Sequence, residues 1–552
     1  MNRRLKRNTG KFALGAATLA AIVFTLANTD IHAQTPANPP TQPSENKADR
    51  LEWFRDQGFG LFIHWSVDSQ LGTVISHSLA GASDDYTARF FSELPKTFNP
   101  RKFHPEDWAA LARLAGVRYV VFTAKHHSGF AMWDTQTTDF GIMHTPFQRD
   151  IFGEVVKAFR DQAIAPGVYF SPDDFHWLYE NKIPINRGAD FDPPKHPGLL
   201  ALDIRQTAEL MTKYGPIDVV FIDGAPDGIK QVVWRLQPNT VITRGAMTTP
   251  EQFIPGVPLE GAWEACITMG TSWQYQPRNE IYKSGGELIR LLYETRAKGG
   301  NLLLNVGPKP DGELPIEQEE RLRELALWMF VNGEAIYGVR PWIVTNEQTT
   351  WITKRKGENS IYAIVTDPWK RGDRKDIVLH SARATAKTEV SVLGQNDQVY
   401  EYSTTIPKTT FHQEADGLHI RAMFAQRLQD NSKWPNPIVV KVTNVEPALA
   451  PPLVETTTAS RSGRGVKLEA NLHSLGDAKA LDVSFEYRAL KGLDTNERSG
   501  QWHSVVPRRV TAAGVFFAIV PAWEPGVPYE FRAVVKHPVL TMYGDAKRVT
   551  LP

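Results

Sequence analysis

Polar side chains end six apolar segments in the first half of the chain. The segments are 59-FGLFIHW-65, 118-RYVVFTAKHH-127, 166-PGVYFS-171, 218-DVVFID-223, 240-TVITR-244 and 259-LEGAWEAC-266. Their polar ends are His64, His126 with His127, Tyr169, Asp223, Arg244 and Glu264. Packing does not explain so many charged or imidazole groups at the ends of buried strands, because burying them without partners is unfavourable. We therefore expect these side chains to meet in one functional pocket.

Two of the six ends are carboxylates, and such a pair predicts hydrolysis of a glycosidic bond. One carboxyl group protonates the leaving oxygen while the other attacks the anomeric carbon, and a separation of about 5–5.5 Å gives retention of configuration. Fifteen Trp and 27 Phe residues offer aromatic walls for a sugar ring, although core packing is their commoner role. Histidines nearby would bind sugar hydroxyls.

Glu264 is our first choice for the acid, because it ends a predicted strand and follows Trp263. An adjacent apolar ring raises the pKa of a carboxyl group by desolvation, as a general acid requires. A structural ion pair is the alternative role for this residue. Other candidates for the acid are Glu260, Asp173, Asp174 and Asp227.

Helical segments alternate with the apolar segments between residues 49 and 342. They are expected at 105–116, 150–163, 200–214, 284–299 and 316–332, and a further strand is expected at 301–307. Strands that alternate with helices favour a parallel sheet, and seven or eight such units fit a closed (β/α)8-type barrel. In such a barrel the carboxyl ends of the strands form the active site, which is where the polar ends fall.

The pattern changes after Pro341. Residues 343–445 contain short alternating segments and predict a β-sandwich domain. A proline-rich joint precedes residues 446–552, whose strands at sandwich spacing resemble a fibronectin type III-like β domain. The chain has one cysteine, Cys266, so an internal disulfide is excluded.

The first 33 residues have the three parts of a signal peptide. Basic residues precede the apolar run 12-FALGAATLAAIVFTLAN-28, and 31-IHAQ-34 allows cleavage after Ala33. An uncleaved membrane anchor is the alternative. Residues 34–48 predict a flexible leader. We therefore expect a periplasmic or secreted protein with no membrane span after signal removal. The net charge of +1 gives no reason to expect a nucleic-acid partner.

Five blocks of the chain resemble the α-L-fucosidases of glycoside hydrolase family 29. They are 52-EWFRDQGFGLFIHW-65, 118-RYVVFTAKHHSGFAMWDT-135, 218-DVVFIDG-224, 263-WEACITMGTSWQY-275 and 299-GGNLLLNVGPKPDGELP-315, in that order. The resemblance covers roughly residues 50–342. It implies a retaining exo-glycosidase that removes terminal α-L-fucosyl residues from glycans through a covalent glycosyl-aspartate, without a cofactor or metal.

The resemblance also implies roles for single residues. The nucleophile falls on Asp223, and fucose contacts fall on His64, His126 and His127. Tyr169 and Arg244 match by their position after strands. Trp133 lies in the second block, where a place in the pocket and a place in the core are equally open.

One departure from the family concerns sugar specificity. Many members carry a Glu-Trp-Tyr run after the first strand, whereas the nearest text here is 84-DDYTARFF-91, with Asp85 in place of tryptophan. Two other functions stay open. A non-catalytic carbohydrate-binding protein would use the same barrel, and a metal-dependent hydrolase would use His64, His126, His127 and Asp223 as ligands.

Overall fold

The computed structural model describes residues 46–278, 280–397, 408–426, 436–463, 465–490, 502–537 and 540–551. The predicted signal peptide lies outside these residues, as does the predicted leader up to residue 45. These described residues belong to one compact unit. Within the described ranges, no helix combines the length and the apolar character needed to cross a membrane.

A seven-stranded parallel sheet organises the first part of the chain, with the order β5-β4-β3-β2-β1-β7-β6. Its strands are β1 Phe59–Ile63, β2 Tyr119–Lys125, β3 Ala165–Phe170, β4 Val219–Ile222, β5 Val241–Ile242, β6 Glu264–Thr268 and β7 Asn301–Val306. Nearly every residue of these strands is buried, which is why they read as continuous apolar runs rather than as alternating ones. The predicted α/β barrel-type class is confirmed.

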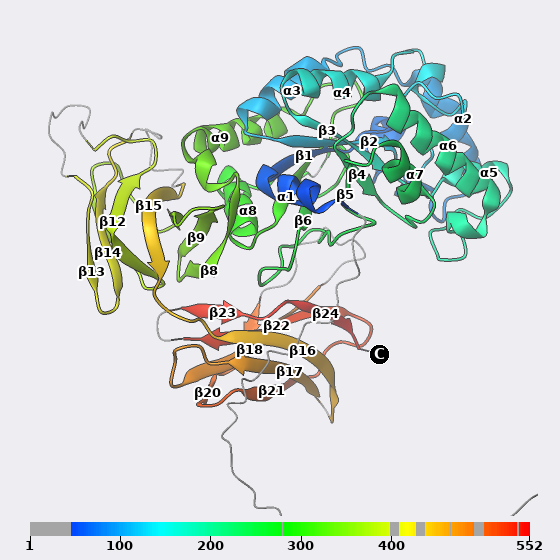
Figure 1. Ribbon diagram of the computed structural model, residues 1–552. Helices are drawn as coiled ribbons and strands as arrows, with labels where there is room; N and C mark the ends of the chain where they lie inside the picture. Colours follow the sequence, from blue (N-terminus) through cyan, green and yellow to red (C-terminus); the bar gives the residue numbers. More distant parts are fainter. Residues whose placement is uncertain are drawn as a thin grey trace, which may run out of the picture. The chain divides into compact units, whose positions relative to one another are not determined.

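Helices follow most of the strands and cover the outside of the sheet, as α3, α4, α6 and α7 do in Figure 1. Their bounds are α1 Ala48–Gln57, α2 Asp84–Thr97, α3 Pro105–Leu114, α4 Ile151–Asp161, α5 Phe175–Glu180, α6 Pro197–Lys213, α7 Ile229–Leu236, α8 Gly285–Ala297 and α9 Ile316–Asn332. Capping side chains set several of these starts. Asp150 accepts from the Gly153 amide at α4, and Ser284 accepts from the Glu287 amide at α8. The sequence did not predict α1, α2, α5 or α7.

The side of the sheet between β5 and β6 is irregular. Residues 248–251 run parallel to β6 through two isolated bridges, Thr248 to Trp263 and Glu251 to Cys266. The amide of Cys266 donates to the Pro250 carbonyl at 3.0 Å, and the amide of Gln252 donates to the Cys266 carbonyl at 2.9 Å. An extended segment thus stands beside β6 and holds Glu251 at the level of Cys266.

The predicted strand at 259–266 is placed wrongly by about one strand length. Strand β6 begins at Glu264, whereas the sequence pattern predicted that a strand ends there. The preceding residues form bends rather than a strand. The segment was misread because an apolar run such as LEGAW does not distinguish a strand from a buried loop.

The rest of the chain forms antiparallel sheets. A five-stranded sheet, β12-β15-β10-β9-β8, and a three-stranded sheet, β11-β14-β13, contribute to one apolar core. These strands are β8 Val339–Glu347, β9 Thr350–Arg355, β10 Ile361–Val365, β11 Arg374–Leu379, β12 Ala382–Val392, β13 Thr410–Glu414, β14 Gly417–Met423 and β15 Ile438–Pro447.

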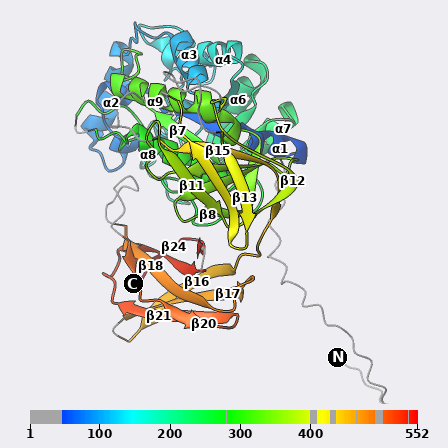
Figure 2. The same cartoon turned by 90° about the vertical axis from the view of Figure 1, so that its left-hand side faces the viewer.

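Two further sheets pack around a separate core near the end of the chain, drawn orange to red in Figure 2. One has the order β16-β17-β21, and the other has β19-β18-β22-β23, with β20 beside β18 and β24 beside β22. Their bounds are β16 Leu453–Ser462, β17 Gly465–Ser474, β18 Leu481–Ala489, β19 His503–Ser504, β20 Arg508–Val510, β21 Gly514–Pro521, β22 Pro528–Lys536, β23 Thr541–Tyr543 and β24 Lys547–Thr550. The fibronectin type III-like assignment and the domain boundaries stay predictions.

Candidate active site

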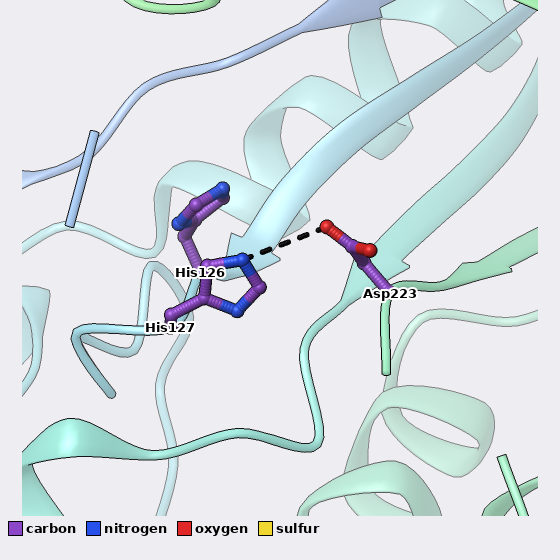
Figure 3. Close-up of side chains that lie close together, drawn as sticks. All are labelled: His126, His127 and Asp223. Carbon is purple, nitrogen blue, oxygen red and sulfur yellow. Dashed lines mark ion pairs between the residues drawn. The ribbon is translucent and has the colours of Figure 1, made fainter. Parts of the chain in front are cut away.

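A cavity at the carboxyl ends of the parallel strands brings together six of the eight predicted site residues. They are His64, His126, His127, Tyr169, Asp223 and Arg244. The other lining residues are Phe62, His77, Arg187, Phe221, Glu251, Cys266 and Trp273. Figure 3 shows the imidazole rings of His126 and His127 beside the carboxylate of Asp223, with a dashed line from His127. The strands thus deliver side chains from distant parts of the chain to one point.

Asp223 follows the last residue of β4 and is held by hydrogen bonds and cations. The Tyr169 hydroxyl donates to Oδ2 at 2.8 Å, and Nη1 of Arg244 donates to Oδ1 at 3.2 Å. Arg187 lies 3.9 Å from Oδ1. Burial by itself raises the pKa of Asp223, but the guanidinium groups of Arg244 and Arg187 outweigh it and hold the pKa below its ordinary value. Asp223 is therefore ionised at neutral pH.

The buried histidines are neutral. Burial lowers the pKa of His64 to about 3, and it lowers the pKa values of His126 and His127 well below their usual range. Positive charge nearby, such as that of Arg187 beside His127, acts in the same direction. A neutral imidazole has one donor and one acceptor nitrogen. If a protein group occupies one of them, the other can bind a sugar hydroxyl in only one sense, as donor or as acceptor.

Protein partners of Nδ1 assign the tautomers of His64 and His127. Nδ1 of His64 lies 2.6 Å from Oδ1 of Asn305, an atom that can only accept. Nδ1 of His127 lies 2.5 Å from Oγ of Ser171, whose own proton goes to the Asp173 carbonyl at 3.1 Å. Both Nδ1 atoms therefore carry the proton, and both Nε2 atoms are acceptors. Nε2 of His127 is 3.6 Å from Oδ2 of Asp223.

Glu264 lies away from the cavity, contrary to our expectation. Its side chain is fully buried at the start of β6, where its Oε2 accepts from the Tyr119 hydroxyl at 2.5 Å. Tyr119 can cross the inside of the barrel because residue 60 is glycine: a Cβ there would lie 2.3 Å from Cζ of the ring. Because β6 begins at Glu264 rather than ending there, this carboxyl group lies toward the amino end of the strand, away from the carboxyl ends that form the cavity.

Burial raises the pKa of Glu264 to about 7, although its bonds with Tyr119 and Thr243 and the charge of Arg244 act against the rise. Glu264 therefore binds its proton more tightly in the folded chain than in the unfolded chain. The folded state loses stability as pH rises from the ordinary carboxyl pKa to about 7, on the order of 3 kcal/mol in total.

Replacing Glu264 with glutamine should remove this loss. The Glu264→Gln variant should gain several degrees in its thermal unfolding midpoint over the wild type at pH 8, and clearly less at pH 5. Scanning calorimetry at the two pH values checks this. An equal change at both values would show that the carboxyl group does not titrate in this range.

Trp133 is also outside the cavity. It is fully buried, and its indole nitrogen donates to Glu209 at 3.1 Å. The remaining acid candidates do not line the cavity either. Asp173 is paired with Arg187 at 2.7 Å, and Asp174 caps α5 and lies 3.3 Å from Lys125. Asp227 is exposed beside Lys230, and Glu260 is exposed.

Asp84 and Asp85 begin α2 after the capping residue Ser83. Asp85 is largely exposed and pairs with Arg89 at 2.9 Å. Neither aspartate lines the cavity, so they are not the counterpart of a sugar-binding Glu-Trp pair. From the connection after β1, His77 lines the cavity instead.

Glu251 is a cavity carboxylate that was not predicted from the sequence. It lines the cavity, is about one third exposed, and accepts from Nη2 of Arg244 at 2.8 Å. Arg244 therefore binds Asp223 with one nitrogen and Glu251 with the other. One guanidinium thus links two carboxylates that line the same cavity.

Donor atoms of His126, His127 and Asp223 lie within 4.8 Å of one another, as a metal ligand set would require. The charge balance does not favour a metal, because Arg244 and Arg187 already neutralise the carboxylate. The arrangement favours a small uncharged ligand rich in hydroxyl groups.

Comparison with known proteins agrees with this chemistry. The sequence profile of the alpha-L-fucosidase family matches residues 25–334, more than half of the chain. The chain belongs to the alpha-L-fucosidase family. It is accordingly a glycoside hydrolase, which confirms the predicted enzyme class and the predicted action on α-L-fucosides.

The match to individual relatives in this family covers most of the length of each relative. An alpha-L-fucosidase from Branchiostoma floridae is 31% identical over 405 residues, which are 65% of this chain and 88% of that protein. The plasma alpha-L-fucosidase of Homo sapiens is 29% identical over 425 residues, 68% of this chain and 89% of that one.

Solved structures include alpha-L-fucosidase isoenzyme 1 from Paenibacillus thiaminolyticus, at 27% identity and a TM-score of 0.59, covering 72% of this chain and 99% of that one. The alpha-fucosidase of Thermotoga maritima in complex with fucose has 26% identity and a TM-score of 0.56, and the match covers 71% of this chain and 96% of that one. These similarities confirm the predicted family.

Proposed function

We propose that the protein releases terminal α-L-fucosyl residues from glycans through a covalent bond between Asp223 and the sugar, with Glu251 as acid and base. The observation that carries this proposal is that Arg244 binds both carboxylates in one cavity lined by neutral histidines. The Thermotoga relative, whose structure holds fucose, supports fucose as the sugar.

In the first step, Asp223 attacks the anomeric carbon while Glu251 gives its proton to the departing oxygen. The bond from the anomeric carbon to Oδ of Asp223 forms as the bond to the leaving oxygen breaks. In the second step, Glu251 takes a proton from water, and the water oxygen displaces Asp223 and releases fucose. Two inversions leave the configuration at the anomeric carbon unchanged.

The polar groups around Asp223 have separate tasks in this reaction. Tyr169 and Arg244 keep Asp223 ionised and oriented for attack. Nε2 of His64 and Nε2 of His127 accept hydrogen bonds from sugar hydroxyls, because the Nδ1 atoms of these histidines donate to Asn305 and Ser171. Trp273, whose ring lies 4.9 Å from that of His64, supplies an apolar wall.

Product stereochemistry tests the proposal. Proton NMR during rapid hydrolysis of an aryl α-L-fucoside should show α-L-fucose first, and the β anomer should rise only later by mutarotation. If β-L-fucose formed first, a covalent intermediate would be excluded. If wild-type protein bound the fucoside without cleaving it, the non-catalytic alternative would replace the proposal.

Chelators should leave the reaction unchanged. Because cationic side chains rather than a metal balance Asp223, dialysis against EDTA should alter kcat and KM by less than about twofold, and added Zn²⁺ should not raise them. Steady-state kinetics before and after dialysis, with elemental analysis of the protein, check this. A loss of activity that Zn²⁺ restores would support the metal-dependent hydrolase.

We also infer that the chain is exported, from the basic, apolar and small-residue parts of residues 1–33. Mass spectrometry of the protein recovered from its producing cells should find a mature chain that begins at Gln34. An intact N-terminus in a membrane fraction would support the uncleaved anchor.

A further inference from the structure

The connection between β1 and α2 forms part of the cavity wall through Ser76 and His77. Ser76 is fully buried and adopts φ 59°, a left-handed conformation that is unfavourable for residues other than glycine. Such backbone geometry persists only where surrounding contacts enforce it, and it is common at functional sites. His77 follows directly, begins a short 3-10 helix at His77–Leu79, and faces the cavity.

Asp68 enforces this conformation. Its side chain is fully buried, and its Oδ2 accepts from the Ser76 amide at 2.7 Å. Gln274 supports the same connection from another part of the chain, because its Nε2 donates to the Thr73 carbonyl at 3.2 Å. On the other side of His77, the Tyr86 hydroxyl donates to Oγ of Ser78 at 2.9 Å. His77 is thus presented by a segment that is fixed before and after it.

The Ser76 hydroxyl also orients His126. It accepts from the Ser128 amide at 2.9 Å, and it lies 2.9 Å from Nδ1 of His126. The Ser76 hydroxyl has one hydrogen, and it can donate this hydrogen to Nδ1 of His126. In that arrangement the proton of the neutral His126 ring is on Nε2. His126 is then a donor, whereas His64 and His127 are acceptors. The Ser76 hydroxyl therefore sets the hydrogen-bonding sense of His126, while the Ser76 amide, bound by Asp68, holds the segment that carries His77.

His77 stands at the mouth of the cavity. It is exposed, while His64, His126 and His127 are 1–4% exposed. Its ring centre is 6.1 Å from that of His126 and 5.4 Å from that of His127. His77 therefore combines exposure to solvent with a place in the cavity wall, beside the two histidines next to Asp223.

We propose that His77 is a specificity-determining contact for a ring hydroxyl of the sugar, and that Asp68 and Ser76 are positioning residues that hold His77 and His126 in place. This proposal rests on the proposed function, because it takes the sugar at Asp223 as the ligand. In this protein, His77 in the connection after β1 would therefore make the sugar contact that the Glu-Trp pair, absent here, makes in other family members.

Substrates that lack one hydroxyl test the contact. Kinetics of aryl α-L-fucosides deoxygenated in turn at C2, C3 and C4 are compared for wild type and His77→Ala. With the parent fucoside, His77→Ala should lower kcat/KM about tenfold or more, mostly through KM. With one deoxy sugar the same substitution should cost almost nothing, because the partner hydroxyl is already gone. Equal losses with all four substrates would overturn the proposal.

The same set of substrates tests the roles of Asp68 and Ser76. Asp68→Ala should reproduce the substrate pattern of His77→Ala, whereas Asp68→Asn, which keeps an acceptor for the Ser76 amide, should retain the wild-type pattern. Ser76→Ala keeps that amide but removes the hydroxyl beside His126, so its loss should depend on a different sugar hydroxyl from the loss in His77→Ala. A uniform loss with all substrates would mean that these residues only stabilise the fold. His144→Ala, an exposed histidine paired with Asp139, serves as the matched control and should be neutral.

The two proposals fail in different ways. If wild-type protein did not hydrolyse the parent fucoside, the proposed function would be wrong. If wild-type protein hydrolysed it and the losses from His77→Ala and from deoxygenation were additive at every position, the proposed function would stand and only the His77 contact would be wrong.

Discussion

Replacement of Asp223 with alanine should lower kcat for an aryl α-L-fucoside by at least about 10⁴-fold, because removing a nucleophile removes the covalent route itself. Tyr169 and Arg244 would lose their shared partner but keep other contacts: Tyr169 packs on Phe221, and Arg244 retains Glu251. The fold should therefore persist, which circular dichroism and the thermal midpoint check.

Asp227→Ala is the matched control for this substitution. Asp227 lies four residues further along, is exposed, and pairs only at the surface with Lys230, so its loss should leave kcat unchanged. Azide adds a second test. With Asp223→Gly and an activated substrate, azide should occupy the vacated space and give a fucosyl azide of inverted configuration. Residual activity above about one hundredth of wild type would argue against a nucleophilic role for Asp223.

Glu251→Gln should separate substrates by their leaving groups. For a fucosyl disaccharide, kcat/KM should fall by about 10³-fold, because the departing alkoxide needs a proton. For 2,4-dinitrophenyl α-L-fucoside, whose leaving group needs none, the first step should change by less than about tenfold. Glutamine can still accept from Arg244, so the geometry around Asp223 should be retained.

The comparison between Glu251 and Glu264 decides the identity of the acid. Glu264→Gln should leave both substrates within about threefold of wild type, because its carboxyl group lies inside the barrel on Tyr119 rather than in the cavity. If Glu264→Gln showed the leaving-group dependence and Glu251→Gln did not, the acid would be Glu264 as the sequence first indicated.

The sequence predicts well those site residues that lie at the ends of strands. His64, His126, His127 and Asp223 each follow a fully buried strand, and a parallel sheet places the carboxyl ends of its strands together. Tyr169 was found for a similar reason, because it lies in the buried carboxyl-terminal half of β3. For these residues, the local pattern alone carries the spatial information.

Glu251, His77 and Arg187 were not predicted, because all three lie in irregular segments. Glu251 stands in an extended segment that contacts β6 only through isolated bridges, and His77 follows a residue with positive φ. Neither has a periodic pattern that fixes its direction. A signal for Glu251 was nevertheless present, since it comes seven residues after the strand-end Arg244 on the irregular side of the barrel.

Glu264 shows how a small error in a boundary changes a functional assignment. Strand β6 spans only five residues, so moving it by its own length carries a residue from one end of the sheet to the other. Trp133 shows a different limit. Its block resembles the family, but burial and the bond to Glu209 make it part of the core, which sequence cannot distinguish from a place in the cavity.

Covalent trapping is the most direct test of the central claim. Wild-type protein treated with 2-deoxy-2-fluoro-α-L-fucosyl fluoride should lose activity over time and gain the mass of one fluorofucosyl group. Peptide mass spectrometry should find that group on Asp223 alone, with the label reduced or absent in Asp223→Ala. A label on another residue, or none on a preparation that hydrolyses fucosides, would contradict the account.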